Sequence, residues 1–199
     1  MRKEKKIETK PFFEIYSCQT SNTKQKDNSE EEPKGNILVA GEIKSRIYKN
    51  LFGKSGEENK GEGYILYKND IILKRISPIY VTLIDKENMI LGSNLICIRI
   101  KKEWIKKIYP GFVACYIETK IPDFTREAKL PTVVISQLEN ELIKLGIKLE
   151  NIFYEEQKSI GEAWQLNNIQ YEYDKYLADE SFGYNRDLII RKMNKELGE

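Results

Sequence analysis

Two short patterns in the chain combine residue types that could support catalysis. Gly53-Lys54-Ser55 matches the end of a phosphate-binding loop, in which backbone N–H groups and a lysine hold the phosphates. The first glycine of that pattern would fall at residue 48, which is Tyr48, and the stretch before it favours a helix rather than the required strand. The phosphate loop is therefore incomplete, and nucleotide hydrolysis is not expected.

Glu118-Thr-Lys120 follows an apolar run, as does the E-x-K pattern of metal-dependent nucleases, in which carboxylates hold Mg²⁺ and the lysine orients the attacking water. Asp70 or Asp85 could supply the upstream carboxylate. The same spacing recurs by chance in so charged a chain, at Glu8-Thr-Lys10 and at Glu42-Ile-Lys44. A metal-dependent nuclease is kept as an alternative function.

The composition excludes several further kinds of catalytic and metal-binding site. The chain has no histidine, which excludes Ser-His-Asp and Cys-His nucleophile pairs and histidine-based metal sites. Its three cysteines, Cys18, Cys97 and Cys115, form no C-x-x-C pair, and a zinc cluster or a disulfide framework is not expected. Cys97 and Cys115 lie in apolar stretches and are interpreted as buried small hydrophobes. No catalytic residue, metal or cofactor is predicted.

The formal net charge of +2 conceals a division along the chain. Residues 1–150 carry 27 basic against 21 acidic side chains, whereas residues 151–199 carry 6 against 10. A mildly basic body suits a polyanion such as DNA, and an acidic segment suits a different partner. Tyr48, Tyr67 and Tyr80 lie near basic residues, and such a mixture could stack on bases and hold phosphates.

The pattern of apolar residues predicts a mixed α/β fold. Runs rich in β-branched and aromatic residues predict strands at 6–18, 36–40, 64–76, 79–84, 89–100 and 130–136. Helical spacing is found at 42–51, on both sides of Pro110 and through Leu142, Leu145 and Ile147. A long helix is predicted from Glu155, with a break at Gly183. No apolar run reaches membrane-spanning length and the basic N-terminus precedes no apolar segment, so a cytoplasmic protein is expected.

One ordered series of patterns resembles the target-recognition domains in specificity subunits of type I restriction-modification systems. Tyr67-Lys-Asn-Asp70-Ile-Ile-Leu-Lys-Arg75 is similar to the family's "x-x-G-D-I-L-x-x-R" strand, with Asn69 in place of glycine. The segment from Ile90 to Arg99 resembles the following "S-S-N-x-I-V-I-R" strand, here with Gly92-Ser93-Asn94.

Two later segments continue the resemblance in the same order. Ile108-Tyr-Pro110-Gly-Phe112-Val-Ala-Cys-Tyr116-Ile117 is similar to the "P-x-Y-L-x-x-Y-L" helix. Ile135-Ser136 and the segment from Leu149 through Glu156-Gln157 to Ile160 resemble "I-S … I-x-L-P-x-x-E-Q-x-x-I", without its proline. The resemblance runs from about residue 7 to the C-terminus and covers one recognition domain and one conserved helix, about half of such a subunit.

The resemblance implies sequence-specific binding of double-stranded DNA on behalf of a methyltransferase subunit, by a recognition domain at 1–153 followed by a helical arm at 154–199. Because DNA-contacting side chains differ most between members of such families, the candidate site residues are basic and polar ones near the matched strands: Lys44, Arg46, Lys49, Lys74, Arg75 and Asn94.

The acidic arm should associate with the methyltransferase subunit or, as a homodimer, with a second copy of the chain. Its candidate interface residues are Ile160, Trp164 and Tyr171, which share one helical stripe with Asn167 or Asn168. A module of the same fold that binds only proteins is the third possible function.

Overall fold

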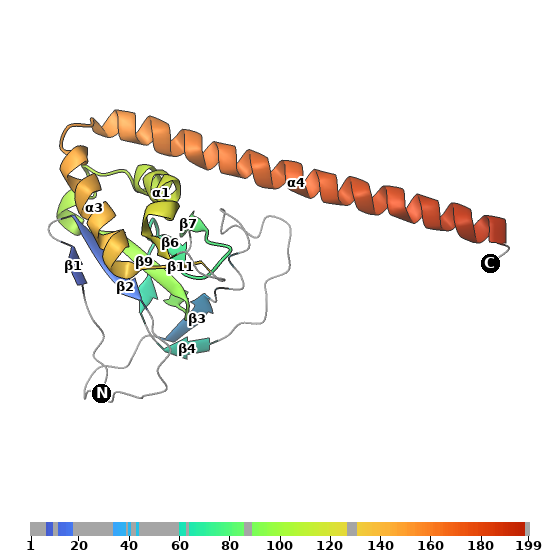
Figure 1. Cartoon of the computed structure of the whole chain (residues 1–199), viewed down its shortest axis with the longest axis horizontal. Helices are drawn as coiled ribbons and strands as arrows, with labels where there is room; N and C mark the ends of the chain where they lie inside the picture. The colour runs from blue at the N-terminus through green and yellow to red at the C-terminus, as the bar shows by residue number, and fades with distance from the viewer. Residues whose placement is uncertain are drawn as a thin grey trace.

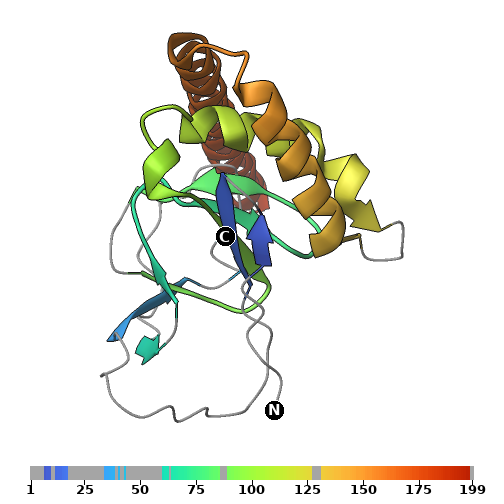
Figure 2. The same ribbon diagram turned by 90° about the vertical axis from the view of Figure 1, so that its left-hand side faces the viewer.

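The computed structural model describes residues 7–9, 12–17, 34–38, 40, 43, 60–62, 64–85, 89–126 and 131–197. These residues form a mixed α/β body from which one long helix extends (Figure 1). Viewed from the end of that helix, the body is layered: helices lie on one face of a central sheet and a second sheet lies beneath it (Figure 2). The expected mixed α/β class, with sheets followed by a long C-terminal helix, is confirmed at this level.

The central sheet has five strands in the order β1-β2-β9-β6-β7, and every neighbouring pair is antiparallel. The strands are β1 (Ile7–Thr9), β2 (Phe13–Ser17), β9 (Leu95–Ile100), β6 (Ile71–Lys74) and β7 (Val81–Leu83). The run expected at 6–18 is thus a hairpin rather than one strand, because its second half folds back so that Thr9 pairs with Phe13.

A smaller sheet has the order β4-β3-β8-β5. Its strands are β4 (Lys60–Glu62), β3 (Lys34–Leu38), β8 (Met89–Leu91) and β5 (Ile65–Leu66). The pair β3 and β8 is parallel, whereas its other pairs are antiparallel. A third pair joins β10 (Thr125–Arg126) to β11 (Thr132–Val133). A strand was expected at 130–136, and among the described residues of that run only those of β11 form one.

The central sheet is buried on both faces because its strands alternate two sets of apolar side chains. On β9, Ile96 and Ile98 enter a core shared with the helices, whereas Leu95 and Cys97 enter a second core against the smaller sheet. Arg99 follows Leu95 and Cys97 in the same alternation and so lies on the side of the smaller sheet. This places a cationic side chain between two layers.

Two asparagines carry the chain from the smaller sheet into the central one. Asn69 and Asn94 have φ of 73° and 62°, the left-handed region that asparagine enters more readily than most residues. Asn69 separates β5 from β6, and Asn94 separates β8 from β9. The runs expected as strands at 64–76 and 89–100 are therefore each divided between two sheets, since the backbone turns at these residues.

The helices begin close to the positions that the sequence indicates. Pro110 is the first residue of α1 (Pro110–Thr119), where a missing N–H is tolerated. Before it, only a short 3₁₀ turn, η1 (Lys102–Trp104), replaces the expected helix. After α2 (Ile121–Phe124), the helix α3 (Ile135–Leu149) buries Leu142 and Leu145, whereas Ile147 is exposed.

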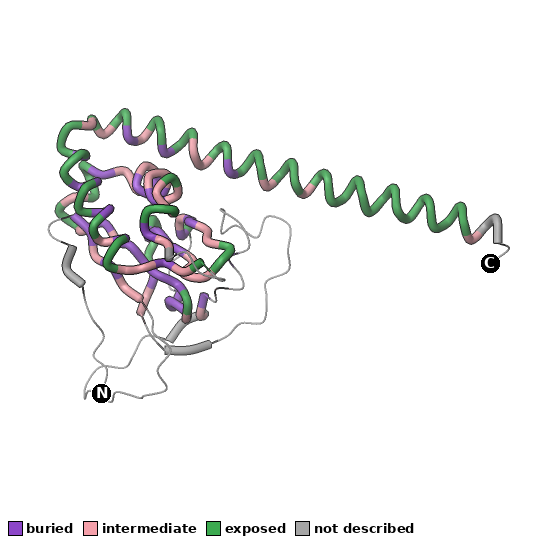
Figure 3. Tube along the Cα trace, in the orientation of Figure 1, coloured by how far each residue is buried: buried purple, intermediate pink, exposed green. Residues whose placement is uncertain are grey.

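The final helix, α4 (Tyr154–Leu197), is continuous over 44 residues. The expected break at Gly183 is wrong: a Cβ there would meet nothing within 4 Å, and one glycine costs a helix only about 1 kcal/mol. Figure 3 shows that the first part of α4 lies on the body and that the rest extends away from it with exposed residues. No helix in the described part of the chain has both the length and the apolar character needed to cross a membrane.

Candidate functional site

Lys74, Arg75 and Asn94 meet at one end of the β6–β9 pair. Lys74 is paired with Leu95 across the ladder, and the next amide, that of Arg75, donates to the carbonyl oxygen of Asn94 at 2.9 Å. The carbonyl oxygen of Arg75 accepts from the Val133 amide at 3.0 Å. The backbone of this corner is therefore held from both sides, while Asn94 itself is exposed.

The side chain of Lys74 lies beside the apolar core of the smaller sheet. Its Nζ is 3.5 Å from the carbonyl oxygen of Ile43 and 5.7 Å from the centre of the Tyr80 ring. Among the described residues neither Lys74 nor Arg75 forms a salt bridge. The other three basic candidates, Lys44, Arg46 and Lys49, lie outside the described residues.

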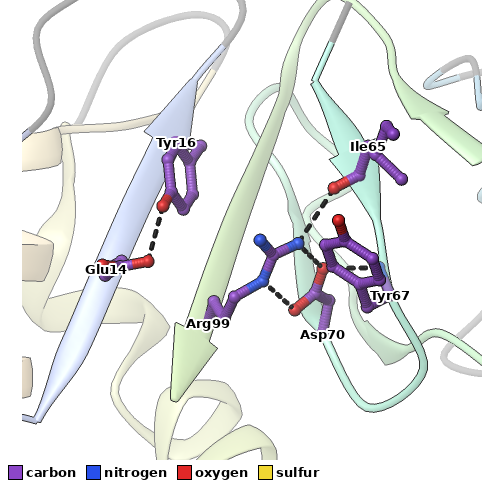
Figure 4. A network of polar contacts seen from close by, with 6 residues as sticks. All are labelled: Glu14, Tyr16, Ile65, Tyr67, Asp70 and Arg99. Carbon is purple, nitrogen blue, oxygen red and sulfur yellow. Dashed lines mark hydrogen bonds and ion pairs between the residues drawn. The ribbon is translucent and has the colours of Figure 1, made fainter. Parts of the chain in front are cut away.

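A bidentate ion pair joins two residues quoted from the matched strands, Asp70 and Arg99 (Figure 4). Arg99 Nε donates to Asp70 Oδ1 at 2.8 Å and Nη2 donates to Oδ2 at 2.5 Å, a bidentate pair. Nη2 also donates to the carbonyl oxygen of Ile65 at 2.9 Å, and Asp70 Oδ2 accepts from the Tyr67 amide at 2.8 Å. The pair thereby ties β9 to the turn between the two sheets.

Three tyrosine rings surround the Arg99 guanidinium. Its central carbon lies 4.4 Å from the ring centre of Tyr67, 4.9 Å from that of Tyr64 and 5.6 Å from that of Tyr16. Tyr16 and Tyr64 stack with their centres 3.8 Å apart, and the Tyr16 hydroxyl donates to Glu14 Oε2 at 2.5 Å. The outermost ring, that of Tyr67, is half exposed.

Burial and the neighbouring charges shift the pKa values of this cluster. Burial opposes the charge of Arg99, but the hydrogen bonds and negative charge of Asp70 outweigh it, so the pKa of Arg99 is raised. Burial also raises the pKa of Tyr64, and burial together with Glu14 raises that of Tyr16. The Arg99 guanidinium therefore stays charged, and the hydroxyls of Tyr16 and Tyr64 stay neutral, which suits a structural element rather than proton transfer.

The residues of the alternative nuclease site have other partners. Glu118 Oε2 accepts from Trp164 Nε1, and Lys120 pairs with Asp123 at 3.0 Å. Asp70 is bound by Arg99 on the far side of the sheet from α1. In the described ranges no three acidic, cysteine or histidine side chains lie close enough to hold a metal ion. The described geometry thus gives the nuclease alternative no support.

The base of the arm is fixed to the body by Gln157, which is fully buried. Its Oε1 accepts from the Tyr109 amide at 3.0 Å, and its Nε2 donates to the carbonyl oxygens of Lys107 at 3.1 Å and Ile152 at 3.0 Å. One turn later Gly161 lies so close to α1 that a Cβ would be 2.6 Å from the Phe112 nitrogen. The two helices therefore approach backbone to backbone.

The three interface candidates on the arm do not form one free surface. Trp164 is half-buried and packs against the body core, and Asn168 on the same face is buried. Ile160 and Tyr171 are 46% and 55% exposed. These candidates lie on neighbouring turns of α4, but the body of the same chain covers the middle of this face, where Trp164 contacts α1 and is only partly exposed.

No family model matches the chain, and a search of curated proteins finds no match to it.

Proposed function

We propose that this protein is a sequence-specific DNA-binding subunit of a restriction-modification-like system, which directs a methyltransferase or nuclease partner to its target. The proposal rests on the resemblance of the matched segments to specificity subunits. It treats residues 1–153 as the recognition domain and 154–199 as the arm.

The observation that carries the proposal is that the matched residues have specific structural roles in this fold. Asn69 occupies a left-handed position, which explains why the family pattern has glycine there. Asp70 of the first strand pattern and Arg99, which ends the second, bind each other. Pro110 begins α1, and Gln157 joins the arm to the body. If the matches to the family patterns had arisen by chance, the matched residues would not be expected to have such structural roles.

Two further features suit a DNA-binding role. The body is basic, and Lys74, Arg75 and Asn94 meet at one corner with no carboxylate bound to the two cations among the described residues. Lys and Arg contacts to phosphates supply affinity, whereas polar side chains such as that of Asn94 can read base edges.

Selection from a random duplex library tests this function. The full-length chain should enrich a consensus, and one base change within it should weaken binding by about 5- to 150-fold, the range that single mismatches commonly produce. Failure to enrich any sequence would overturn the proposal. No DNA binding even at low salt, together with an arm that still binds a protein, would favour the protein-only interaction module.

A further inference from the structure

A cluster of lysines follows the last residue of β9. Residues 101–107, which we call the basic loop, contain four lysines and one acidic residue, Glu103. The lysines are Lys101, Lys102, Lys106 and Lys107. The first of them is partly exposed and the other three are exposed. The basic loop thus concentrates positive charge on a small part of the surface.

The lysines of the basic loop differ from three other lysines in their electrostatic surroundings. Lys120, Lys144 and Lys158 each form a salt bridge with a carboxylate three or four residues away. No lysine of the basic loop forms a salt bridge with a described residue, and Lys107 Nζ lies instead 4.9 Å from the ring centre of Trp104. Because neighbouring like charges repel one another, an anion bound at the loop would relieve this repulsion.

Three contacts hold the backbone of the basic loop in place. The Lys101 amide donates to the carbonyl oxygen of Phe12 at 3.0 Å, directly beyond the pairing of β2 with β9. The Trp104 ring packs edge-on against the Phe12 ring, with centres 4.6 Å apart. At the far end of the loop, the carbonyl oxygen of Lys107 accepts from Gln157 Nε2 at 3.1 Å. An anion can therefore bind here with little cost for ordering the backbone.

The basic loop is separate from the corner formed by Lys74, Arg75 and Asn94. Asn94 precedes β9 and Lys101 follows it, so the two places are about 24 Å apart along an extended strand. Lys101 continues the alternation that places Arg99 on the side of the smaller sheet, where Lys74 also lies. On a DNA duplex the same distance covers about seven base pairs. One duplex is therefore long enough to contact both places.

We propose that the basic loop binds the phosphate backbone of duplex DNA beside the sequence that the recognition domain reads. Lysine binds phosphate as a point charge, and such contacts carry no sequence information. DNA is favoured over an anionic membrane because the loop exposes one large apolar side chain, that of Ile105, whereas membrane binding strengthens with apolar area. The inference deepens the proposed function. It rests on that function only in that the same duplex also contacts the corner of Lys74 and Arg75.

Binding of the full-length chain to random-sequence duplexes at several salt concentrations tests the inference. In Lys102→Ala/Lys106→Ala the log–log slope should become shallower by roughly one to two, with at least about tenfold weaker binding at about 0.1 M salt. Lys120→Ala/Lys158→Ala is the control, because it removes the same charge from two lysines that already have acidic partners, and its slope should equal that of the wild type. An unchanged slope in Lys102→Ala/Lys106→Ala, or an equal change in the control, would overturn the inference.

Sequence selection separates this inference from the proposed function. Lys102→Ala/Lys106→Ala should enrich the same consensus as the wild type, because phosphate contacts do not read sequence. A changed consensus would contradict a role limited to phosphates. So would a loss of binding to phosphatidylglycerol vesicles with DNA binding intact, which would indicate a membrane surface as the partner. If the wild type enriches no consensus, but binds random duplexes in a salt-dependent manner that the loop variant loses, the proposed function alone is contradicted.

Discussion

Arg99 binds both carboxylate oxygens of Asp70, at 2.8 Å for Nε to Oδ1 and 2.5 Å for Nη2 to Oδ2, and the Asp70 side chain is only 4% exposed. The pair spans from β9 to the turn where the chain leaves the smaller sheet. Arg99 also donates to the carbonyl oxygen of Ile65 in β5, so this pair links the two sheets.

Removing one member of this pair should destabilise the fold strongly. Asp70→Ala leaves the Arg99 guanidinium largely buried without its counter-ion, and we expect a loss of about 3–5 kcal/mol in the free energy of unfolding, measured by urea denaturation. Asp123→Ala, which removes the exposed pair with Lys120, is the control and should leave the denaturation midpoint nearly unchanged. Equal effects of the two substitutions would contradict a buried role for Asp70.

The stability of Asn69 variants should depend on the backbone conformation at this position rather than on the chemistry of the side chain. Since its φ is 73°, Asn69→Ala should cost about 1 kcal/mol, whereas Asn69→Gly should be neutral or slightly stabilising. Thermal unfolding of the two variants checks the order. A glycine variant less stable than the alanine variant would show that the asparagine side chain, and not the left-handed backbone, matters there.

The same substitution at two glycines of α4 should have opposite effects. Gly183→Ala adds a Cβ in open space and should stabilise the helix by up to about 1 kcal/mol. Gly161→Ala adds a Cβ 2.6 Å from the Phe112 nitrogen and should destabilise the joint between arm and body. Circular dichroism during heating measures the stability of both variants. A destabilised Gly183→Ala variant would indicate that the helix does break at residue 183.

The Cys97 thiol should be unreactive in the folded protein. Cys97 is buried between the two sheets, and burial raises its pKa, which lowers the thiolate fraction at any given pH. Labelling with a maleimide at pH 8 should modify Cys97 only after unfolding, as peptide mass analysis can show. Fast modification under native conditions would mean that the smaller sheet does not cover this strand.

The sequence predicted the mixed class, the start of α1 at Pro110 and the burial of Cys97, because local apolar patterns determine these features. It did not predict that Asn69 and Asn94 divide two strand-like runs between sheets, since a left-handed turn leaves no apolar signal. It also placed Trp164 on a free surface. Periodicity shows which side chains share a helix face, but not which of two possible partners covers it.

For the candidate site, the sequence identified Lys74, Arg75 and Asn94, and the fold brings these three together. The Asp70–Arg99 pair was missed as a unit although both residues were noted in the matched strands. The available signal was that each is a charged residue within an otherwise apolar strand run, a setting in which charges are commonly paired.

The salt dependence of DNA binding tests the central claim most directly. The wild-type chain should bind its selected duplex with an affinity that falls linearly on a log–log plot against salt concentration, by about 0.9 per phosphate contact. In the folded Lys74→Ala/Arg75→Ala double variant that slope should be shallower by roughly one to two, because two phosphate contacts are lost. A wild type that binds no duplex at low salt, or a double variant with unchanged affinity and slope, would contradict the account.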